Sequence, residues 1–240
     1  MIKEIKSRQN DLIKEVAKLS DSSARREHQK FKVDGFHMFE MARDSGALLE
    51  VYSLKEVLGL NLSIPQYIVS EEIMEKISSS KSPQGIVSVC KYIEEKPVSS
   101  SRVLYLDDVS DPGNLGTILR TALAFGFVDV ILSMNCCSIY NEKALQASQG
   151  SIFKMNIVYG ENLLKLKEKG YKILATEIKG SKSLEKVQKP NKFVLVLGNE
   201  AHGVSEPVLN LADERIRIDI ENIESLNVAI AGAIAMYALR

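Results

Sequence analysis

The chain has 240 residues, of which 45% are hydrophobic and 26% charged, and its 31 basic residues balance its 31 acidic ones. This composition is typical of a globular protein and argues against an intrinsically disordered chain, which would lack the apolar residues for a core. The zero net charge argues against nucleic-acid binding through the whole surface. Any nucleic acid must therefore meet a local basic patch.

The cysteines, the histidines and the apolar stretches argue against a disulfide-bonded, metal-binding, secreted or membrane protein. The three cysteines include no CxxC spacing and the three histidines are scattered, which predicts reduced thiols and no metal site. The N-terminal sequence MIKEIKSRQNDL is charged where a signal peptide needs an apolar core. The apolar stretch at residues 226–239 is shorter than the ~20 residues of a membrane span. We therefore expect a cytoplasmic protein with no membrane segment.

The first 93 residues predict a small α/β domain, because helical periodicity and short apolar strands alternate along them. The expected helices cover residues 5–19, 36–43 and 71–77, and the expected strands cover 30–33, 49–54, 66–69 and 85–92. The polar, serine-rich stretch at 94–101 then predicts a linker.

From residue 102 onward, strands and helices alternate. The strand candidates are 102–108, 128–133, 154–158, 171–177, 192–198 and 214–220, and the helices 115–125, 142–148, 162–169 and one within 226–239. This alternation predicts a parallel sheet with helices on both faces. Ligands of such sheets bind beyond the carboxyl ends of the strands, so the loops after the first, fifth and sixth strands are candidate sites.

The first of these loops reads DVSDPGNLGTILR, residues 108–120. It matches neither GxxxxGK[ST] nor GxGxxG, so neither common nucleotide-binding loop is predicted. Asn114 either caps the following helix or contacts a ligand. Arg120 is either a surface residue of that helix or a donor aimed at a phosphate or carboxylate.

The second loop, VLGNEAHGVS at 196–205, offers Glu200, which is either solvated or holds a protein group or a substrate hydroxyl. His202 is more simply an exposed loop residue than a general base. In the third loop, DIENIESLNVAIAGA, Ser225 predicts the N-cap of the last helix. Asn227 is expected in its first turn, near a helix N-terminus suited to polar or anionic groups.

Together, the three loops resemble the three motifs of the SpoU (TrmH-like) RNA ribose 2′-O-methyltransferases of the SPOUT class. The pattern N-x-G-x-x-x-R falls on Asn114, Gly116 and Arg120, and LVLGNEAHGVS and SLNVAIA follow in the family's order. The N-terminal part is similar to that family's L30e-like substrate-binding domain in SRQNDLIKEVAKL, FKVDG and PQGIVSV.

The resemblance implies an α/β fold with an L30e-like RNA-binding domain at 1–93, a linker at 94–101 and a parallel-sheet SPOUT domain with a trefoil knot at 102–240. It also implies S-adenosylmethionine (SAM) as cofactor and a homodimer with the active site at its interface. The implied catalytic residues are Asn114, Arg120, Glu200, Ser225 and Asn227. The implied SAM contacts are Leu197, Gly198, Ile218, Ile220, Leu226 and Asn227. Two positions depart from the family: Asp219 stands where Pro is frequent, and Ala201 where Gly is common.

A basic excess marks the N-terminus, where residues 1–32 hold nine Lys or Arg against five Asp or Glu. These residues either meet RNA phosphates or form a solvated helix face. The candidates for RNA contact are Arg8, Lys14, Arg25, Arg26 and Lys30. Ribosomal RNA, in particular 23S rRNA, is favoured over tRNA as the partner.

Two other functions fit the sequence less well than RNA methylation. A dehydrogenase is disfavoured because GxGxxG is missing. A non-catalytic RNA-binding protein is disfavoured because Arg120, Glu200 and Asn227 are all in place.

Overall fold

The computed structural model describes residues 2–61, 63–178 and 180–240, and its contacts divide into two units. The first holds the chain up to Ile93 together with Tyr140–Phe153, and the second holds Glu94–Ile139 and Lys154–Arg240. Both are α/β, as expected. The grouping differs from the predicted domains at Tyr140–Phe153, which packs with the first unit although it lies within the C-terminal part of the sequence.

The first unit is built on a mixed five-stranded sheet in the order β1-β4-β3-β5-β2, in which β5 runs antiparallel to both of its neighbours. The strands are β1 (Ile2–Ile5), β2 (Lys30–Asp34), β3 (Leu48–Ser53), β4 (Gln66–Val69) and β5 (Ile86–Lys91). The helices are α1 (Asp11–Lys18), α2 (Ser22–His28), α3 (Phe36–Asp44), α4 (Glu71–Ile77) and α6 (Glu142–Ser148), followed by a 3₁₀ turn at Ser151–Lys154.

The N-terminal end of this unit corrects one prediction. Residues expected to start a helix at 5 instead finish the edge strand β1, and α1 begins only at Asp11. The reason is local, because Asn10 caps the helix by accepting the N–H of Leu12 at 3.0 Å. The helix α2 was not predicted, since its sequence SSARREH carries no apolar stripe.

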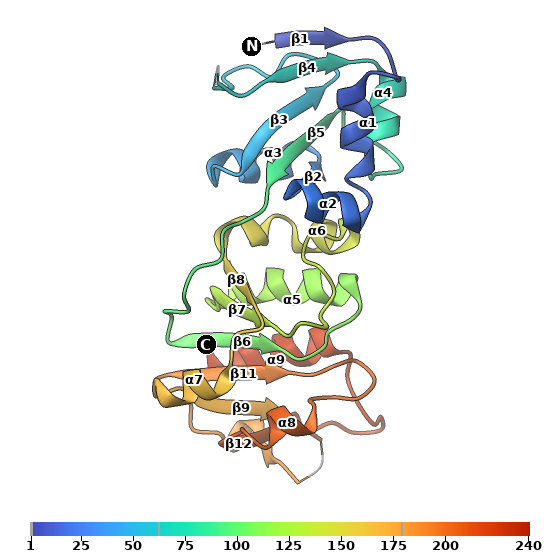
Figure 1. The fold of residues 1–240 in the computed structure, drawn as a ribbon. Helices are drawn as coiled ribbons and strands as arrows, with labels where there is room; N and C mark the ends of the chain where they lie inside the picture. Colours follow the sequence, from blue (N-terminus) through green and yellow to red (C-terminus); the bar gives the residue numbers. More distant parts are fainter. Residues whose placement is uncertain (1, 62, 179) are drawn as a thin grey trace. The chain divides into compact units, whose positions relative to one another are not determined.

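The second unit is built on a seven-stranded sheet in which every pairing is parallel, in the order β10-β12-β9-β11-β6-β7-β8 (Figure 1). The strands are β6 (Arg102–Leu106), β7 (Asp129–Leu132), β8 (Asn156–Tyr159), β9 (Lys172–Thr176), β10 (Lys182–Ser183), β11 (Phe193–Leu197) and β12 (Glu214–Arg217). The helices are α5 (Pro112–Ala124), α7 (Leu163–Glu168), α8 (Glu206–Leu209) and α9 (Val228–Leu239), with a 3₁₀ turn at Leu184–Lys186.

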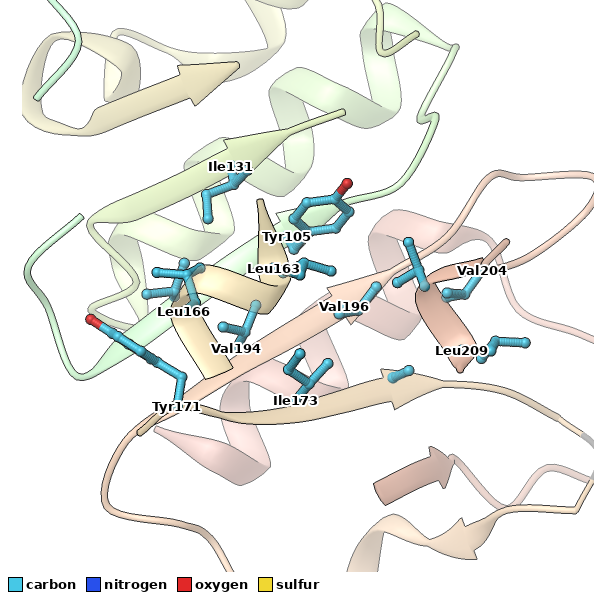
Figure 2. Packing of buried hydrophobic residues seen from close by; sticks show 13 residues of the cluster. Tyr105, Ile131, Leu163, Leu166, Tyr171, Ile173, Val194, Val196, Val204 and Leu209 are labelled. Carbon is cyan, nitrogen blue, oxygen red and sulfur yellow. The ribbon is translucent and has the colours of Figure 1, made fainter. Parts of the chain in front are cut away.

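Alternate strand residues of this sheet pack in opposite directions. On one face, Val194 and Val196 of β11 pack with Leu163 and Leu166 of α7 in a cluster that Figure 2 shows. The helices α5 and α9 contact each other, and α9 also contacts β11. The residues of the central strands β6 and β11 are almost fully buried, which is typical of a parallel sheet covered on both faces.

The central order β11-β6-β7 decides where a site can form. Because parallel strands end at one edge of the sheet, the loops after Leu197, Leu106 and Leu132 emerge side by side. Two of these are loops singled out from the sequence. The trefoil knot implied by the family resemblance stays a prediction. Within the described part of the chain, no helix is long and apolar enough to cross a membrane.

Candidate active site

Glu200 lies at the centre of a hydrogen-bonded cluster in the second unit. Its Oε1 accepts from the main-chain N–H of Asp111 and from Nδ2 of Asn114, both at 3.1 Å. Its Oε2 accepts from the N–H of Ser110 at 3.3 Å and from the Ser110 hydroxyl at 3.2 Å. Burial raises the pKa of Glu200, but the bonds from Asn114, Asp111 and Ser110 outweigh it and hold that pKa below its ordinary value. The carboxylate is thus ionised near neutral pH, with both oxygens engaged.

Asn227 connects the third loop to the same cluster. Its Nδ2 donates to Oδ1 of Asn114 at 3.0 Å, while its own Oδ1 accepts from the N–H groups of Ala229 at 2.9 Å and Ile230 at 3.3 Å. Asn227 is therefore the N-cap of α9. The prediction that Ser225 caps this helix is wrong, because the helix begins at Val228 and the Asn227 side chain reaches its free N–H groups.

The first helix of the site is not capped by Asn114, which was one of the two alternatives left open by the sequence. Asp111 is the N-cap of α5 and accepts the N–H of Asn114 at 2.8 Å, with Pro112 in the first turn. Asn114 thus lies inside the helix, where its side chain contacts Glu200 and Asn227.

The loop that carries Glu200 is closed by its own main chain. Asn199 and Gly203 exchange two backbone hydrogen bonds, of 2.9 and 3.0 Å. A Cβ on Gly198 would lie 2.1 Å from the carbonyl carbon of Gly203 and 2.2 Å from the nitrogen of Val204. Gly198 is therefore required by the crossing of two backbone segments, whatever ligand it also meets.

Arg120 and Ser225 do not join the cluster. Arg120 is exposed on α5, and no hydrogen bond or ion pair links its side chain to another residue that the structure describes. It follows Asn114 by six residues, which is about one and two thirds helical turns, so the two side chains leave the helix on different sides. Ser225 is exposed in the loop before α9. The structure thus brings together Asn114, Glu200 and Asn227 out of the five expected catalytic residues.

The residues expected to hold SAM differ in what they offer. Leu197 is 1% exposed and its carbonyl accepts the N–H of Asp107 at 2.8 Å, so its side chain belongs to the core. By contrast, no hydrogen bond between described residues uses the main-chain groups of Gly198, Ile218, Ile220 or Leu226. Free main-chain donors and acceptors beside half-buried apolar side chains suit a ligand with a heterocyclic base. The residues present therefore fit SAM.

Asp219, which stands where the family frequently has Pro, has a hydrogen-bond partner close by in the sequence. Oδ1 of Asp219 accepts from Nε of Arg217 at 2.9 Å, and the Arg217 guanidinium also donates to the carbonyl of Ser181. A hydrogen bond with Ser183 and the charge of Arg217 lower the pKa of Asp219 below its ordinary value. Asp219 thus fixes the end of β12 in this chain.

The basic residues expected to contact RNA are not all on the surface of the first unit. Arg8, Lys14 and Arg26 are exposed, and Lys30 is partly buried beside Glu50 at 3.4 Å. Arg25 is 5% exposed, and its Nη1 donates to the carbonyls of Leu19 at 2.9 Å and Ser20 at 2.6 Å. The expectation for Arg25 is corrected, because its guanidinium binds backbone carbonyls just after α1 and is withdrawn from solvent.

Three contributors to the cluster were missed from the sequence. Ser110 and Asp111 supply main-chain donors to Glu200, and Asn199 holds the turn beside it. The Asp-Pro pair at 111–112 is a recognisable helix-start signal and could have identified the cap. No sequence pattern reports which main-chain N–H groups face a distant carboxylate.

With this geometry established, similarity to known proteins defines the class. Residues 101–237 match the SpoU rRNA Methylase family, and residues 10–88 match the MRM3-like substrate binding domain. The chain is 33% identical to the 23S rRNA (guanosine(2553)-2'-O)-methyltransferase RlmP of Bacillus subtilis, over the full length of both chains.

Solved structures agree with the sequence match. A putative RNA methyltransferase of the TrmH family from Porphyromonas gingivalis is 29% identical, with a TM-score of 0.86 over 97% of this chain and 98% of that one. An AdoMet-bound rRNA methyltransferase from Sinorhizobium meliloti is 26% identical, with a TM-score of 0.89 over 100% of this chain and 97% of that one.

The fold, the three-loop cluster and these similarities define a SAM-dependent RNA ribose 2′-O-methyltransferase of the SPOUT class. The chain belongs to the SpoU rRNA Methylase family, whose model covers more than half of its length.

Proposed function

We propose that this enzyme methylates a ribose 2′-hydroxyl of 23S rRNA, in the cytoplasm. The observation that carries the proposal is the hydrogen bonding of Asn114, Glu200 and Asn227 at the carboxyl end of a parallel sheet. The three residues come from the first turn of α5, the turn after β11 and the N-cap of α9. The choice of 23S rRNA is supported by the end-to-end similarity to RlmP of Bacillus subtilis, named as a 23S rRNA methyltransferase.

Glu200 acts in this proposal as an organiser and not as a base. A carboxylate that accepts hydrogen bonds from Ser110, Asp111 and Asn114, with a pKa below its ordinary value, has little tendency to take a proton at neutral pH. It holds Asn114 in place, and Asn114 and Asn227 present their amides beside it.

Arg120 is the group assigned to the RNA. Its guanidinium has no partner among the described residues, so its five N–H donors are available for a phosphate next to the target ribose. A guanidinium stays protonated at working pH, so Arg120 orients and polarises the hydroxyl but does not remove its proton. Correct alignment of the hydroxyl is the main contribution that methyl transfer requires of the protein.

The cofactor side of the site is assigned to the stretch after β11 and the stretch between β12 and α9. SAM supplies, when bound, an electrophilic methyl group on a sulfonium. The free main-chain groups of Gly198, Ile218, Ile220 and Leu226 would hold it, next to Leu197 and Asn227. Because these contacts would be made by the backbone, they tolerate Asp219 where the family often has Pro.

The enzyme is proposed to be a homodimer that pairs through α9. Ile230, Ile234 and Tyr237 are 52%, 39% and 56% exposed, and their spacing places them along one side of this helix. The helix sequence VAIAGAIAMYAL has no charged residue, and an exposed apolar helix face needs a partner. A second copy of α9 would cover this face.

The first unit is proposed to bind RNA through Arg8, Lys14, Arg26 and Lys30. The match of residues 10–88 to a substrate-binding domain supports this assignment. Lys14 is held at 3.0 Å from Asp11, so its charge is partly compensated, whereas Arg8 and Arg26 have no side-chain ion pair among the described residues. The two arginines are therefore the principal expected phosphate contacts.

Methylation of transcripts in vitro tests this function. The purified protein, methyl-labelled SAM and either 23S rRNA or total tRNA are incubated, and the modified nucleotide is mapped. Incorporation at one 2′-hydroxyl of 23S rRNA is expected, with loss in Asn114→Ala. Incorporation into tRNA alone would overturn the choice of RNA, and tight RNA binding without any methylation would leave a non-catalytic RNA-binding protein.

A further inference from the structure

Asp108 has an unusual backbone conformation at the junction of three loops. It follows β6 and has a φ of 59°, in the left-handed region that non-glycine residues rarely adopt. Such a conformation is strained for a residue with a Cβ and persists only where surrounding contacts enforce it.

Those contacts come from the loop after β7. The Ser133 hydroxyl donates to Oδ1 of Asp108 and accepts the N–H of Asp108 at 2.9 Å. Nδ2 of Asn135 donates to Oδ2 of Asp108 at 3.1 Å. Both carboxylate oxygens of Asp108 are therefore bound to protein groups, and none of these groups belongs to the Glu200 cluster.

The hydrogen bonds with Ser133 and Asn135 anchor Asp108, and the main chain of Asp108 connects this anchor to the loop of Glu200. Its carbonyl oxygen accepts Nδ2 of Asn199 at 2.8 Å. Oδ1 of Asn199 in turn accepts the N–H groups of Ala201 at 2.9 Å and His202 at 3.2 Å, which closes the turn that contains Glu200. One amide side chain thus fixes Glu200 relative to Asp108.

The same residue also directs the donors that Glu200 receives. Ser110 and Asp111 follow Asp108 by two and three residues, and their N–H groups bind the Glu200 carboxylate. The left-handed turn at Asp108 sets the direction in which the chain leaves β6. A rotation there would move both donors away from Glu200.

We infer that Asp108 is a positioning residue for RNA methylation, which acts through Asn199 and the Ser110–Asp111 main chain to place Glu200 and Asn114. It does not act as a base or touch the reacting atoms, because Ser133 and Asn135 engage its carboxylate. The kinetic part of this inference rests on the proposed function.

Two substitutions separate positioning from charge. Asp108→Gly keeps the left-handed conformation accessible but removes the anchor on Ser133 and Asn135. Asp108→Asn removes the charge but keeps the anchor, since asparagine tolerates positive φ, its oxygen can accept from Ser133, and its amide can pair with a turned Asn135 amide. We expect kcat to fall by about tenfold or more in the glycine variant, with KM for RNA unchanged, and to stay within about threefold of the wild type in the asparagine variant.

A second aspartate in the same unit provides the matched control. Asp129 accepts the N–H groups of Ser99 and Ser100 and Nδ2 of Asn156, in the region of the strand starts, so Asp129→Ala removes a comparable set of hydrogen bonds. This variant is expected to lose stability without a change in kcat. Equal losses of kcat in the Asp129→Ala and Asp108→Gly variants would mean that Asp108 only stabilises the fold. That result would overturn the inference.

The pKa of Glu200, followed by carbon NMR of its carboxyl group, gives a readout that needs no methylation. In the glycine variant it should rise towards the ordinary glutamate value, because the donors from Ser110 and Asp111 move away. An unchanged pKa would overturn the inference, and so would an asparagine variant as slow as the glycine one. If the wild type methylates no RNA, the proposed function fails, while the NMR comparison still decides whether Asp108 positions Glu200.

Discussion

Asn227 and Asn114 are joined by a hydrogen bond of 3.0 Å between Nδ2 of the first and Oδ1 of the second, although 113 residues separate them in the chain. The same Asn227 side chain caps α9 with its oxygen. One amide therefore has two separable functions: its oxygen caps a helix, and its nitrogen binds Asn114 of the Glu200 cluster.

Substitutions at Asn227 can divide these functions. Asn227→Asp keeps an acceptor for the free N–H groups of α9, and a negative charge is favourable at a helix N-terminus, so the thermal midpoint should change little. It loses the donor to Asn114 and places a second carboxylate near Glu200, so kcat should fall. Asn227→Ala loses both contacts and should cost about 1 kcal/mol of unfolding free energy as well. Thermal unfolding and methylation rates of both variants test this; a fully active aspartate variant would contradict it.

Gly198→Ala should damage the loop of Glu200 by steric conflict alone. Its Cβ would meet the Gly203–Val204 backbone, which cannot yield as a flexible side chain would, so a loss of about 1–3 kcal/mol is expected together with loss of activity. Gly170→Ala is the matched control, because Gly170 has a φ of +85° but open space around its Cβ position. The control should lose about 1 kcal/mol by backbone strain and keep its activity. Urea unfolding and a methylation assay measure both, and a stable, active Gly198→Ala would refute the steric account.

The depressed pKa of Glu200 predicts a defined pH dependence of stability. Because the folded-state pKa is below the unfolded one, the contribution is fully present above the ordinary value of 4.5 and is lost as the pH falls through the lower folded value. The difference in unfolding free energy between the wild type and Glu200→Gln should therefore shrink as the pH falls below 4.5. Urea titrations from neutral pH to pH 3 measure it.

Glu221→Gln is the control for this series, since Glu221 is exposed and has no hydrogen-bond partner among the described residues. Because Glu221 makes no such contacts with the described residues, Glu221→Gln should change the free energy of unfolding at neutral pH by less than Glu200→Gln does. A Glu200→Gln difference that grows on acidification would have the wrong sign and would refute the assignment of the shift to hydrogen bonds on the carboxylate.

Arg120→Lys keeps the charge but loses the planar donor fork. Hydrogen bonds to charged groups are worth about 1.5–3 kcal/mol, so the rate of methylation should fall by about 10- to 100-fold. Stability should be unchanged, because Arg120 is exposed and unpaired among the described residues. Single-turnover rates and thermal unfolding check the two statements. Near-complete activity of the lysine variant would contradict the proposal that Arg120 binds a phosphate beside the target ribose.

Arg26→Glu should weaken RNA binding and leave SAM binding intact. Removal of one phosphate contact lowers the slope of log affinity against log salt by about one. Lys169→Glu, a charge reversal at an exposed position of the second unit, serves as the control and should have a smaller effect. Filter binding at several salt concentrations, with a parallel SAM titration, measures this. Equal loss of RNA and SAM binding in Arg26→Glu would indicate misfolding.

Much of the second unit could be predicted from its sequence because its strands are continuous apolar runs that end in polar loops. The run KFVLVLG contains β11, and the turn after it carries Glu200 as expected. Short polar elements such as α2 had no such signal. The choice between Ser225 and Asn227 as helix cap could not be made from residue type, since both are favourable, and was decided by which side chain reaches the free N–H groups of α9.

Other features depend on contacts distant in sequence. The packing of Tyr140–Phe153 with the first unit arises from tertiary contacts that periodicity does not report. Periodicity also does not report the burial of Arg25, which binds carbonyls five and six residues earlier in the chain. The left-handed conformation of Asp108 is similarly imposed by Ser133 and Asn135 from another strand end. Sequence patterns located the loops of the site, while long-range hydrogen bonds determined which of their residues meet.

The central claim is that the loops around Asn114, Glu200 and Asn227 form the site that methylates a ribose of 23S rRNA. It is tested most directly by mapping 2′-O-methyl groups over the 23S rRNA of cells that contain the wild-type protein, the Arg120→Ala variant or no copy of it. The account predicts one 2′-O-methyl group that is present with the wild type and absent in the other two cases. An identical 23S rRNA methylation pattern in all three would contradict it.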